Sequence, residues 1–332
     1  MSNIPFPLKL IIGVTKLNAN RTNYTLKERR ASANRFMKFM DAFAGLKSPS
    51  VQEPYNTSFT ATDGHQVALR VFTPAGVTAP LPVWVYFHGG GFMVGSFDVR
   101  DNFCKKISEQ SHCLVVSVQY RLAPEYPFPR GLNDCYEATS WLAANAHTLG
   151  GDGSKLAVGG ESAGGNLAAV VSLMARDKGS PAILHQTLLY PSLDFTGGTS
   201  SMSQENKGYL LTPELMMAFG RAYLPPGHDR KDPYCSPVYA DPQGLPPAVI
   251  ITAEHDPLRD EGNFYAAKLQ EAGIRVVHRE YAGMIHDFVL MMPRFLQESR
   301  DAIRLVNQEL CTVFAVKTEL PVEAAACAPT LK

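Results

Sequence analysis

The chain has 332 residues, of which 45% are hydrophobic and 19% charged, and its 31 basic side chains balance its 31 acidic ones. This composition is typical of a globular protein, and the zero net charge argues against a nucleic-acid-binding protein, which needs a basic surface. The sequence has neither an apolar run near the roughly 18 residues of a membrane span nor a secretory signal, so we expect a cytoplasmic protein without a membrane span.

The first fifty residues predict a helix, because apolar residues from Phe36 to Phe43 recur at helical spacing among basic ones. The Lys-Ser-Pro-Ser stretch at 47–50 ends this segment. From about Ser58 the apolar period changes to two, and residues 66–72 alternate as a half-buried hairpin strand does.

Farther along, short apolar runs alternate with helical patterns. We expect strands at 83–87, 114–119, 155–158, 186–190, 248–253 and 275–281, and helices at 100–111, 135–144, 166–175, 262–272 and 288–314. Strands that alternate with helices in this way indicate an α/β protein with a mostly parallel central sheet flanked by helices. The alternation breaks between 194 and 234, where a helix at 214–223 stands among glycines, serines and prolines.

This pattern predicts one α/β core interrupted by segments that form a helical cap. The expected boundaries are 1–50 for the N-terminal cap helices, 51–193 and 235–316 for the two parts of the core, 194–234 for the cap insertion, and 317–332 for a flexible tail.

The sequence Gly160-Glu161-Ser162-Ala163-Gly164 matches G-x-S-x-G and stands between an expected strand and an expected helix. In a nucleophile elbow, a strand turns sharply into a helix with the serine at the tip, and small residues on either side prevent clashes with neighbouring backbone. The alternative is an ordinary glycine-rich turn. The strand and helix around the motif favour the nucleophile elbow.

A second glycine motif, His88-Gly89-Gly90-Gly91-Phe92, follows the strand expected at 83–87. Three glycines let a backbone approach a substrate closely, and backbone N–H groups can stabilise an oxyanion. We assign the donors as the N–H groups of Gly90, Gly91 and Ala163. A flexible loop or a phosphate cradle is the alternative, although no Lys-Ser/Thr follows as in a Walker loop. We expect His88 to hold the loop rather than to react.

A serine nucleophile needs a base and an acid that orients the base. In proteins with a nucleophile elbow, the three residues follow in the chain order serine, acid, histidine. Asp256 and His286 each follow an expected strand, at the sheet edge where α/β proteins gather their sites. Glu254 or Asp260 could replace Asp256. The remaining histidines fit less well, because they lie within a strand, one residue too early, or outside the expected loop: His278, His255, His185 and His228.

Five motifs in order give a resemblance to a known family: the His88 glycine loop, Tyr-Arg-Leu-Ala-Pro-Glu at 120–125, Gly-Glu-Ser-Ala-Gly-Gly at 160–165, Asp-Pro-Leu-Arg-Asp at 256–260, and His286. From about residue 55 to 315 the chain resembles the hormone-sensitive-lipase-like (family IV) carboxylesterases of the α/β-hydrolase fold. The resemblance implies a helical cap and a serine esterase whose triad is Ser162, Asp256 and His286. Its mechanism needs neither a metal nor an organic cofactor.

Two residues depart from the family pattern. Glu161 precedes the nucleophile where the family usually has aspartate, and Asp287 follows the histidine where glycine is common. We expect Asp287 to cap the following helix, although an inward-pointing carboxylate would raise the pKa of His286. We interpret the 120–125 motif as an ordered turn with a structural role, with Arg121 and Glu125 available for ion pairing; a role in substrate binding is the alternative.

The predicted function is hydrolysis of short-to-medium acyl esters of small molecules through an acyl-enzyme. Apolar residues of the cap would line an acyl pocket or pack in its interior: Phe36, Phe39, Met40, Phe43, Met216, Met217, Phe219 and Tyr223. A deacetylase or amidase with the same triad is the alternative within the hydrolases. A small-molecule receptor of the same fold is the alternative outside them. The family often forms homodimers through the sheet edge near the C-terminus, and the apolar segment at 288–292 is compatible with such a contact.

Overall fold

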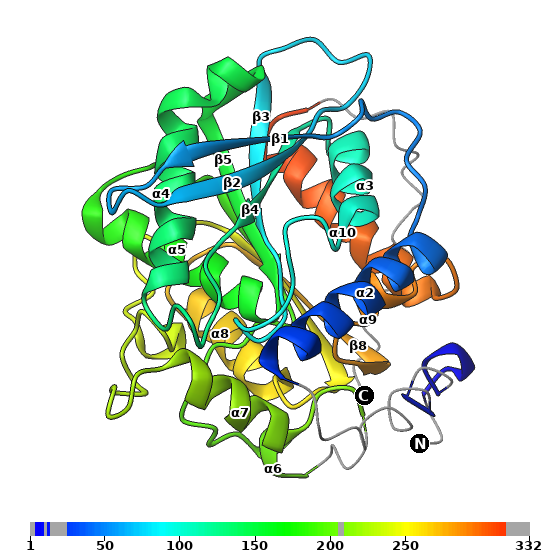
Figure 1. Cartoon of the computed structure of the whole chain (residues 1–332), viewed down its shortest axis with the longest axis vertical. Helices are drawn as coiled ribbons and strands as arrows, with labels where there is room; N and C mark the ends of the chain where they lie inside the picture. The colour runs from blue at the N-terminus through cyan, green and yellow to red at the C-terminus, as the bar shows by residue number, and fades with distance from the viewer. Residues whose placement is uncertain (1–3, 10–11, 14–24, 205–208, 317–332) are drawn as a thin grey trace.

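The structure, a computed structural model, describes residues 4–9, 12–13, 25–204 and 209–316 (Figure 1). Within these residues, eight strands form one sheet in the order β1-β2-β4-β3-β5-β6-β7-β8. Strands β1 and β2 form an antiparallel hairpin, β2 pairs antiparallel with β4, and the other neighbours are parallel. The bounds are β1 Tyr55–Thr60, β2 Gln66–Phe72, β3 Leu81–Phe87, β4 Leu114–Gln119, β5 Gly151–Glu161, β6 His185–Leu189, β7 Ala248–His255 and β8 Val276–Ile285.

Helices cover both faces of the sheet (Figure 1). Every residue of β3 is buried, and its side chains alternate between two apolar layers: Val83 and Val85 face one layer, and Trp84 and Tyr86 the other. Helices α4, α5 and α8 contribute to the first layer, and α3 and α10 to the second. The helix bounds are α2 Leu26–Ala44, α3 Asp101–Ser111, α4 Arg130–Asn145, α5 Ala163–Lys178, α6 Ser200–Gln204, α7 Pro213–Tyr223, α8 Arg259–Glu271, α9 Phe288–Met291 and α10 Gln297–Val313.

The predicted mostly parallel sheet flanked by helices is confirmed. Four strands, β3, β5, β7 and β8, are longer than the apolar runs indicated, and the extensions of β5 and β8 are the largest. Strand β5 begins at Gly151 and shifts register against β3 between Pro82 and Val83. Strand β8 continues to Ile285, which pairs with His255 after another shift in register. An apolar run does not reveal a strand that continues through such an irregularity. The extension of β8 matters because it places His286 directly at a strand end.

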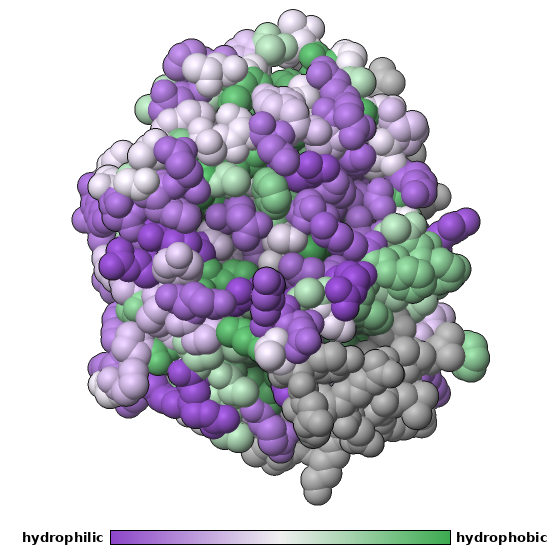
Figure 2. All heavy atoms as spheres, viewed as in Figure 1, coloured by the Kyte–Doolittle hydropathy of each residue, from purple (hydrophilic) through white to green (hydrophobic). Residues whose placement is uncertain are grey.

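Helix α2 begins with a capping box, in which the Thr25 hydroxyl and the Glu28 carboxylate each accept a hydrogen bond from the other residue's backbone N–H. Phe39 and Phe43 stack on its outer face, and Phe43 also contacts Phe295. All three rings are exposed, and Figure 2 shows hydrophobic side chains near the C-terminal end of α2.

Among the described residues, no helix has the length and apolar character required to cross a membrane.

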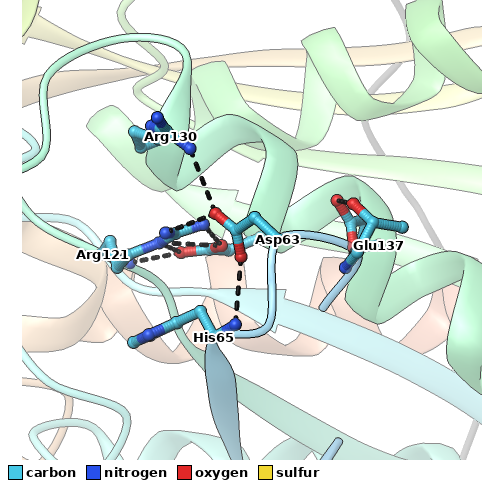
Figure 3. A network of polar contacts seen from close by, with 7 residues as sticks. Asp63, His65, Arg121, Arg130 and Glu137 are labelled. Atoms are coloured by element: carbon cyan, nitrogen blue, oxygen red, sulfur yellow. Dashed lines mark hydrogen bonds and ion pairs between the residues drawn. The ribbon is translucent and has the colours of Figure 1, made fainter. Parts of the chain in front are cut away.

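Arg121, in the motif at 120–125, lies in a network of polar contacts between the β1–β2 turn and α4 (Figure 3). Arg121 contacts Asp134 of α4 at 2.6 Å and Asp63 of the β1–β2 turn at 2.7 Å, while Glu125 pairs with Arg30 of α2 at 2.7 Å. The expected ion pairing of Arg121 and Glu125 is therefore confirmed. Because the Asp134 side chain is fully buried, its charge depends on Arg121 for compensation.

We expect Arg121→Ala to lower the free energy of unfolding by about 3–5 kcal/mol, because it leaves the Asp134 carboxylate buried without its cation. Arg130→Ala is the matched control: its exposed guanidinium contacts the same Asp63 at 3.1 Å, and its loss should cost at most about 1 kcal/mol. Urea denaturation of both variants measures the difference. Equal destabilisation by the two substitutions would contradict this account of the network.

Candidate active site

Ser162 lies at the sharp turn between β5 and α5, with φ 57° and ψ −117°. A non-glycine residue in this region is strained, at a cost of order 1–3 kcal/mol, and needs surrounding structure to hold it. The Ser162 N–H donates to Leu189 O at 2.9 Å. Glycines are required at 160 and 164, because a Cβ at either position would clash with the carbonyl oxygen of Phe87. The predicted nucleophile elbow is present.

The structure brings Ser162, Asp256 and His286 together from three separate strand ends. His286 Nε2 lies 3.0 Å from Ser162 Oγ, and His286 Nδ1 lies 2.7 Å from Asp256 Oδ2. The other oxygen of Asp256 accepts the Leu258 N–H at 2.9 Å, which fixes the carboxylate. Such a series of hydroxyl, imidazole and carboxylate can transfer the serine proton to the imidazole.

Burial by itself lowers the pKa of His286, but the charge and hydrogen bond of Asp256 outweigh it, with smaller contributions from Asp287 and Glu161. The pKa of His286 is therefore raised. Since a base must be neutral to accept a proton, the site can work only above this raised pKa.

The alternative acids have other partners. Glu254 accepts the Gly283 N–H at 2.6 Å, and Asp260 accepts the Ser201 N–H at 2.7 Å. The other histidines also lie elsewhere: His278 is 3.2 Å from Thr252 Oγ1, His228 is 2.9 Å from Asp232, His185 is buried within β6, and His255 packs on Tyr209. The geometry favours Asp256 and His286 over these alternatives.

The glycine loop after β3 lines the same cavity as Ser162. Gly90 and Gly91 have φ values of 114° and 60°, which favour glycine. Within the described part of the chain, the N–H groups of Gly90, Gly91 and Ala163 have no acceptor in the protein. His88 is fully buried beside this loop, and Tyr120 donates to its carbonyl oxygen at 2.7 Å. Burial lowers the pKa of His88 to about 4, so its ring is neutral.

Glu161 connects the nucleophile turn to the glycine loop. Its Oε1 accepts the Gly89 N–H at 2.8 Å, and its Oε2 accepts the Tyr86 hydroxyl. Arg100 approaches the same carboxylate at 3.7 Å. Burial raises the pKa of Glu161 to about 7, against the opposing effect of Arg100. Tyr86 and Arg100 were not predictable from the sequence, because a single residue in a strand or before a helix carries no positional signal.

Asp287 occupies the N-cap position of α9, but its side chain makes no capping hydrogen bond, so the expected side-chain cap is wrong. It adopts φ 66°, and its carboxylate contacts Arg100 Nη2 at 2.6 Å instead. The Tyr190 hydroxyl donates to the second carboxylate oxygen at 3.2 Å. The physical reason is that the buried guanidinium of Arg100 needs a counter-charge, which Asp287 and Glu161 supply together.

The cavity above Ser162 has a volume of about 420 Å³ and is enclosed by the glycine loop and by helices α2 and α7. Four of the predicted apolar residues line it: Phe36, Met216, Met217 and Phe219. Met40 and Tyr223 are buried in packing, whereas Phe39 and Phe43 are exposed on the outside. Of the eight apolar residues expected to line an acyl pocket or pack in the cap, four therefore line the cavity, two are buried and two are exposed.

We expect Asp256→Asn to lower the pKa of His286 more than Asp287→Asn does, because Asp256 supplies both the larger charge effect and a hydrogen bond. The pH titration of the His286 Hε1 resonance measures both shifts. Asp152→Asn, at the opposite end of β5 from Ser162, is the control and should leave the titration unchanged. A titration that Asp256→Asn does not move would contradict the assigned contact.

Comparisons with known proteins place the chain among proteins of one fold family. A family model described as the alpha/beta hydrolase fold matches residues 84–290. Carboxylesterase NlhH of Mycobacterium tuberculosis is 41% identical over 227 residues, which cover 67% of this chain and 71% of the relative. The arylesterase of Saccharolobus solfataricus is 36% identical, covering 81% and 86%. The solved Pyrobaculum calidifontis esterase superposes with a TM-score of 0.86 at 38% identity, covering 95% of this chain and all of that one.

Proposed function

This chain belongs to the alpha/beta hydrolase fold family, within its hormone-sensitive-lipase-like carboxylesterases, and on that premise we propose that it hydrolyses short-to-medium acyl esters with Ser162 as nucleophile. The observation that carries the proposal is the hydrogen-bonded series Ser162–His286–Asp256, with separations of 3.0 and 2.7 Å, at the base of an apolar cavity. Relatives named carboxylesterase, arylesterase and ethyl acetate hydrolase support the same reaction class.

In the proposed reaction, Ser162 Oγ attacks the ester carbonyl carbon while His286 Nε2 takes the hydroxyl proton. Asp256 stabilises the imidazolium that forms. His286 then gives the proton to the leaving alcohol, and the C–O bond to the alcohol breaks, leaving an acyl-enzyme. Water repeats the attack with His286 again as base, and the acid and free Ser162 are released.

The tetrahedral intermediate carries a negative charge on the former carbonyl oxygen. We assign the N–H groups of Gly90, Gly91 and Ala163 as its donors. Their position on the cavity wall and their lack of another acceptor in the described residues support this role. Donors held in place before the reaction need no reorganisation when the charge develops.

Two sequence predictions about the whole protein stay proposals, namely a cytoplasmic location and a homodimer. Strand β8 is at one edge of the sheet, where a second copy could pair. The segment 288–292, however, is buried within the monomer, so it is not available for that contact.

We expect Ser162→Ala to reduce kcat for p-nitrophenyl acetate by a factor of about 10⁴ or more, because the nucleophile is lost while the fold is kept. Release of p-nitrophenol at fixed pH measures the reaction. Ser192→Ala is the matched control, since Ser192 lines the same cavity, and it should retain most activity. Undiminished turnover by Ser162→Ala would refute the assigned nucleophile.

We expect kcat/KM to be highest for short and medium p-nitrophenyl esters and to fall for the palmitate. A cavity of about 420 Å³ can take a short acyl chain together with the p-nitrophenyl group, whereas a palmitoyl chain and the same group together exceed this volume. A series from acetate to palmitate, with a Ser162→Ala blank, measures this preference. The same series should include anilides, because the triad chemistry is shared with amidases. Faster cleavage of palmitate or of anilides would refute the proposed substrate class.

A further inference from the structure

We propose that Asn34, on helix α2, is a positioning residue that holds the glycine loop at 88–95 in the conformation that receives the oxyanion. The proposal rests on the function proposed above. It gives α2 a role beyond covering the cavity, because it links that helix to the backbone that carries two of the assigned donors.

The contact is direct and involves both ends of the Asn34 amide. Asn34 Oδ1 accepts the Gly95 N–H at 2.8 Å, and Asn34 Nδ2 donates to Gly95 O at 3.3 Å. The side chain therefore satisfies both backbone polar groups of a single residue 61 positions away. Such a paired contact restrains the orientation of the Gly95 peptide groups, which one hydrogen bond would leave free to rotate.

Gly95 closes the loop that contains the donors. Gly90 O accepts the N–H groups of Met93 and Val94, so the position of Gly90 depends on the residues that lead to Gly95. Gly95 itself has φ 99°, and a Cβ there would clash with the His88 ring. His88 and Gly95, the first and last residues of the loop, therefore lie against each other. A restraint on Gly95 also restrains Met93 and Val94, whose N–H groups hold the carbonyl of Gly90.

A second contact from the same helix supports this role. Arg30, one turn before Asn34, donates from Nε to Met93 O at 2.7 Å and from Nη2 to Ala123 O at 3.0 Å. Residues four apart lie on the same face of a helix, so one face of α2 contacts the loop at two carbonyls. The loop contains several glycines, whose backbone is costly to order, and it needs such external restraints.

Helix α7 packs against the same loop. The Phe219 ring lies where a Cβ of Gly91 would stand, and Tyr223 stacks on Phe92 with ring centroids 3.8 Å apart. These apolar contacts limit how far the loop can move toward α7, but they do not fix the orientation of its peptide groups. The Asn34 amide does fix it, because its two hydrogen bonds to Gly95 are directional. We therefore assign the alignment of the loop to Asn34 rather than to the aromatic packing.

Lys38 provides a matched control, because it lies one further turn along the same face. Its ammonium contacts Asp98 at 2.6 Å, and this exposed ion pair attaches α2 to the core outside the glycine loop. Lys38→Met therefore weakens the docking of α2 without removing a contact to residues 88–95.

The experiment compares Asn34→Ala, Asn34→Asp and Lys38→Met in the full chain with p-nitrophenyl acetate. We expect Asn34→Ala to lower kcat by about 10- to 100-fold, less than the loss of an oxyanion donor itself, with KM within about twofold. Asn34→Asp keeps the acceptor for the Gly95 N–H and should fall between Asn34→Ala and the native enzyme. Lys38→Met should retain kcat within about twofold.

A second measurement reports on the oxyanion directly. A trifluoromethyl ketone forms a tetrahedral oxyanion adduct with the serine, so its affinity should fall in parallel with kcat in Asn34→Ala. The affinity for a short-chain alcohol, which carries no oxyanion, should not change. Circular dichroism and the Tm verify that each variant is folded.

Unchanged kcat and ketone affinity in folded Asn34→Ala would overturn the proposal. Equal losses in Asn34→Ala and Lys38→Met would also overturn it, because they would assign the effect to helix docking. Failure of the proposed function is distinguishable, since the native enzyme would then hydrolyse none of the esters and bind no trifluoromethyl ketone.

Discussion

The site depends on the parallel pairing of β3 with β5. This pairing places Phe87 opposite Gly160, so both strands end at the same level and their following turns leave the sheet side by side. The glycine loop that follows β3 and the turn at Ser162 that follows β5 are therefore adjacent directly beyond the strand ends. Gly160 and Gly164 are required at this point because the carbonyl oxygen of Phe87 occupies the space a Cβ would need. A shift of this register by one residue would separate the glycine loop from Ser162.

Charge balance behind the triad is the second constraint. Arg100 is buried between Glu161, which precedes the nucleophile, and Asp287, which follows the base. The two positions that depart from the family pattern thus share one guanidinium. A buried carboxylate at either position alone would be costly, whereas together with Arg100 they form a compensated network that also joins the serine turn to the histidine loop.

The cap helices are linked to the chemistry through the glycine loop, which lies between α2 and α7. The cavity is thus formed by the same side chains that contact the loop: Phe219 both lines the cavity and packs on Gly91. This shared use means that the shape of the cavity and the conformation of the glycine loop are coupled. The ends of the parallel strands bring Ser162, Asp256 and His286 together, and residues of the cap helices line the cavity above them.

Much of this protein was predictable from short-range patterns. Apolar periodicity located the strands and helices, and the glycine motifs with the chain order of Ser162, Asp256 and His286 predicted a site that the structure assembles, because each of these signals is local along the chain. The extension of β8 to Ile285, the pairing of Asp287 with Arg100 and the contact of Asn34 with Gly95 were not predictable. The two side-chain contacts join residues 61 and 187 positions apart, and the β8 extension pairs Ile285 with His255 across a shift in register. Which distant residues meet is decided by packing in three dimensions.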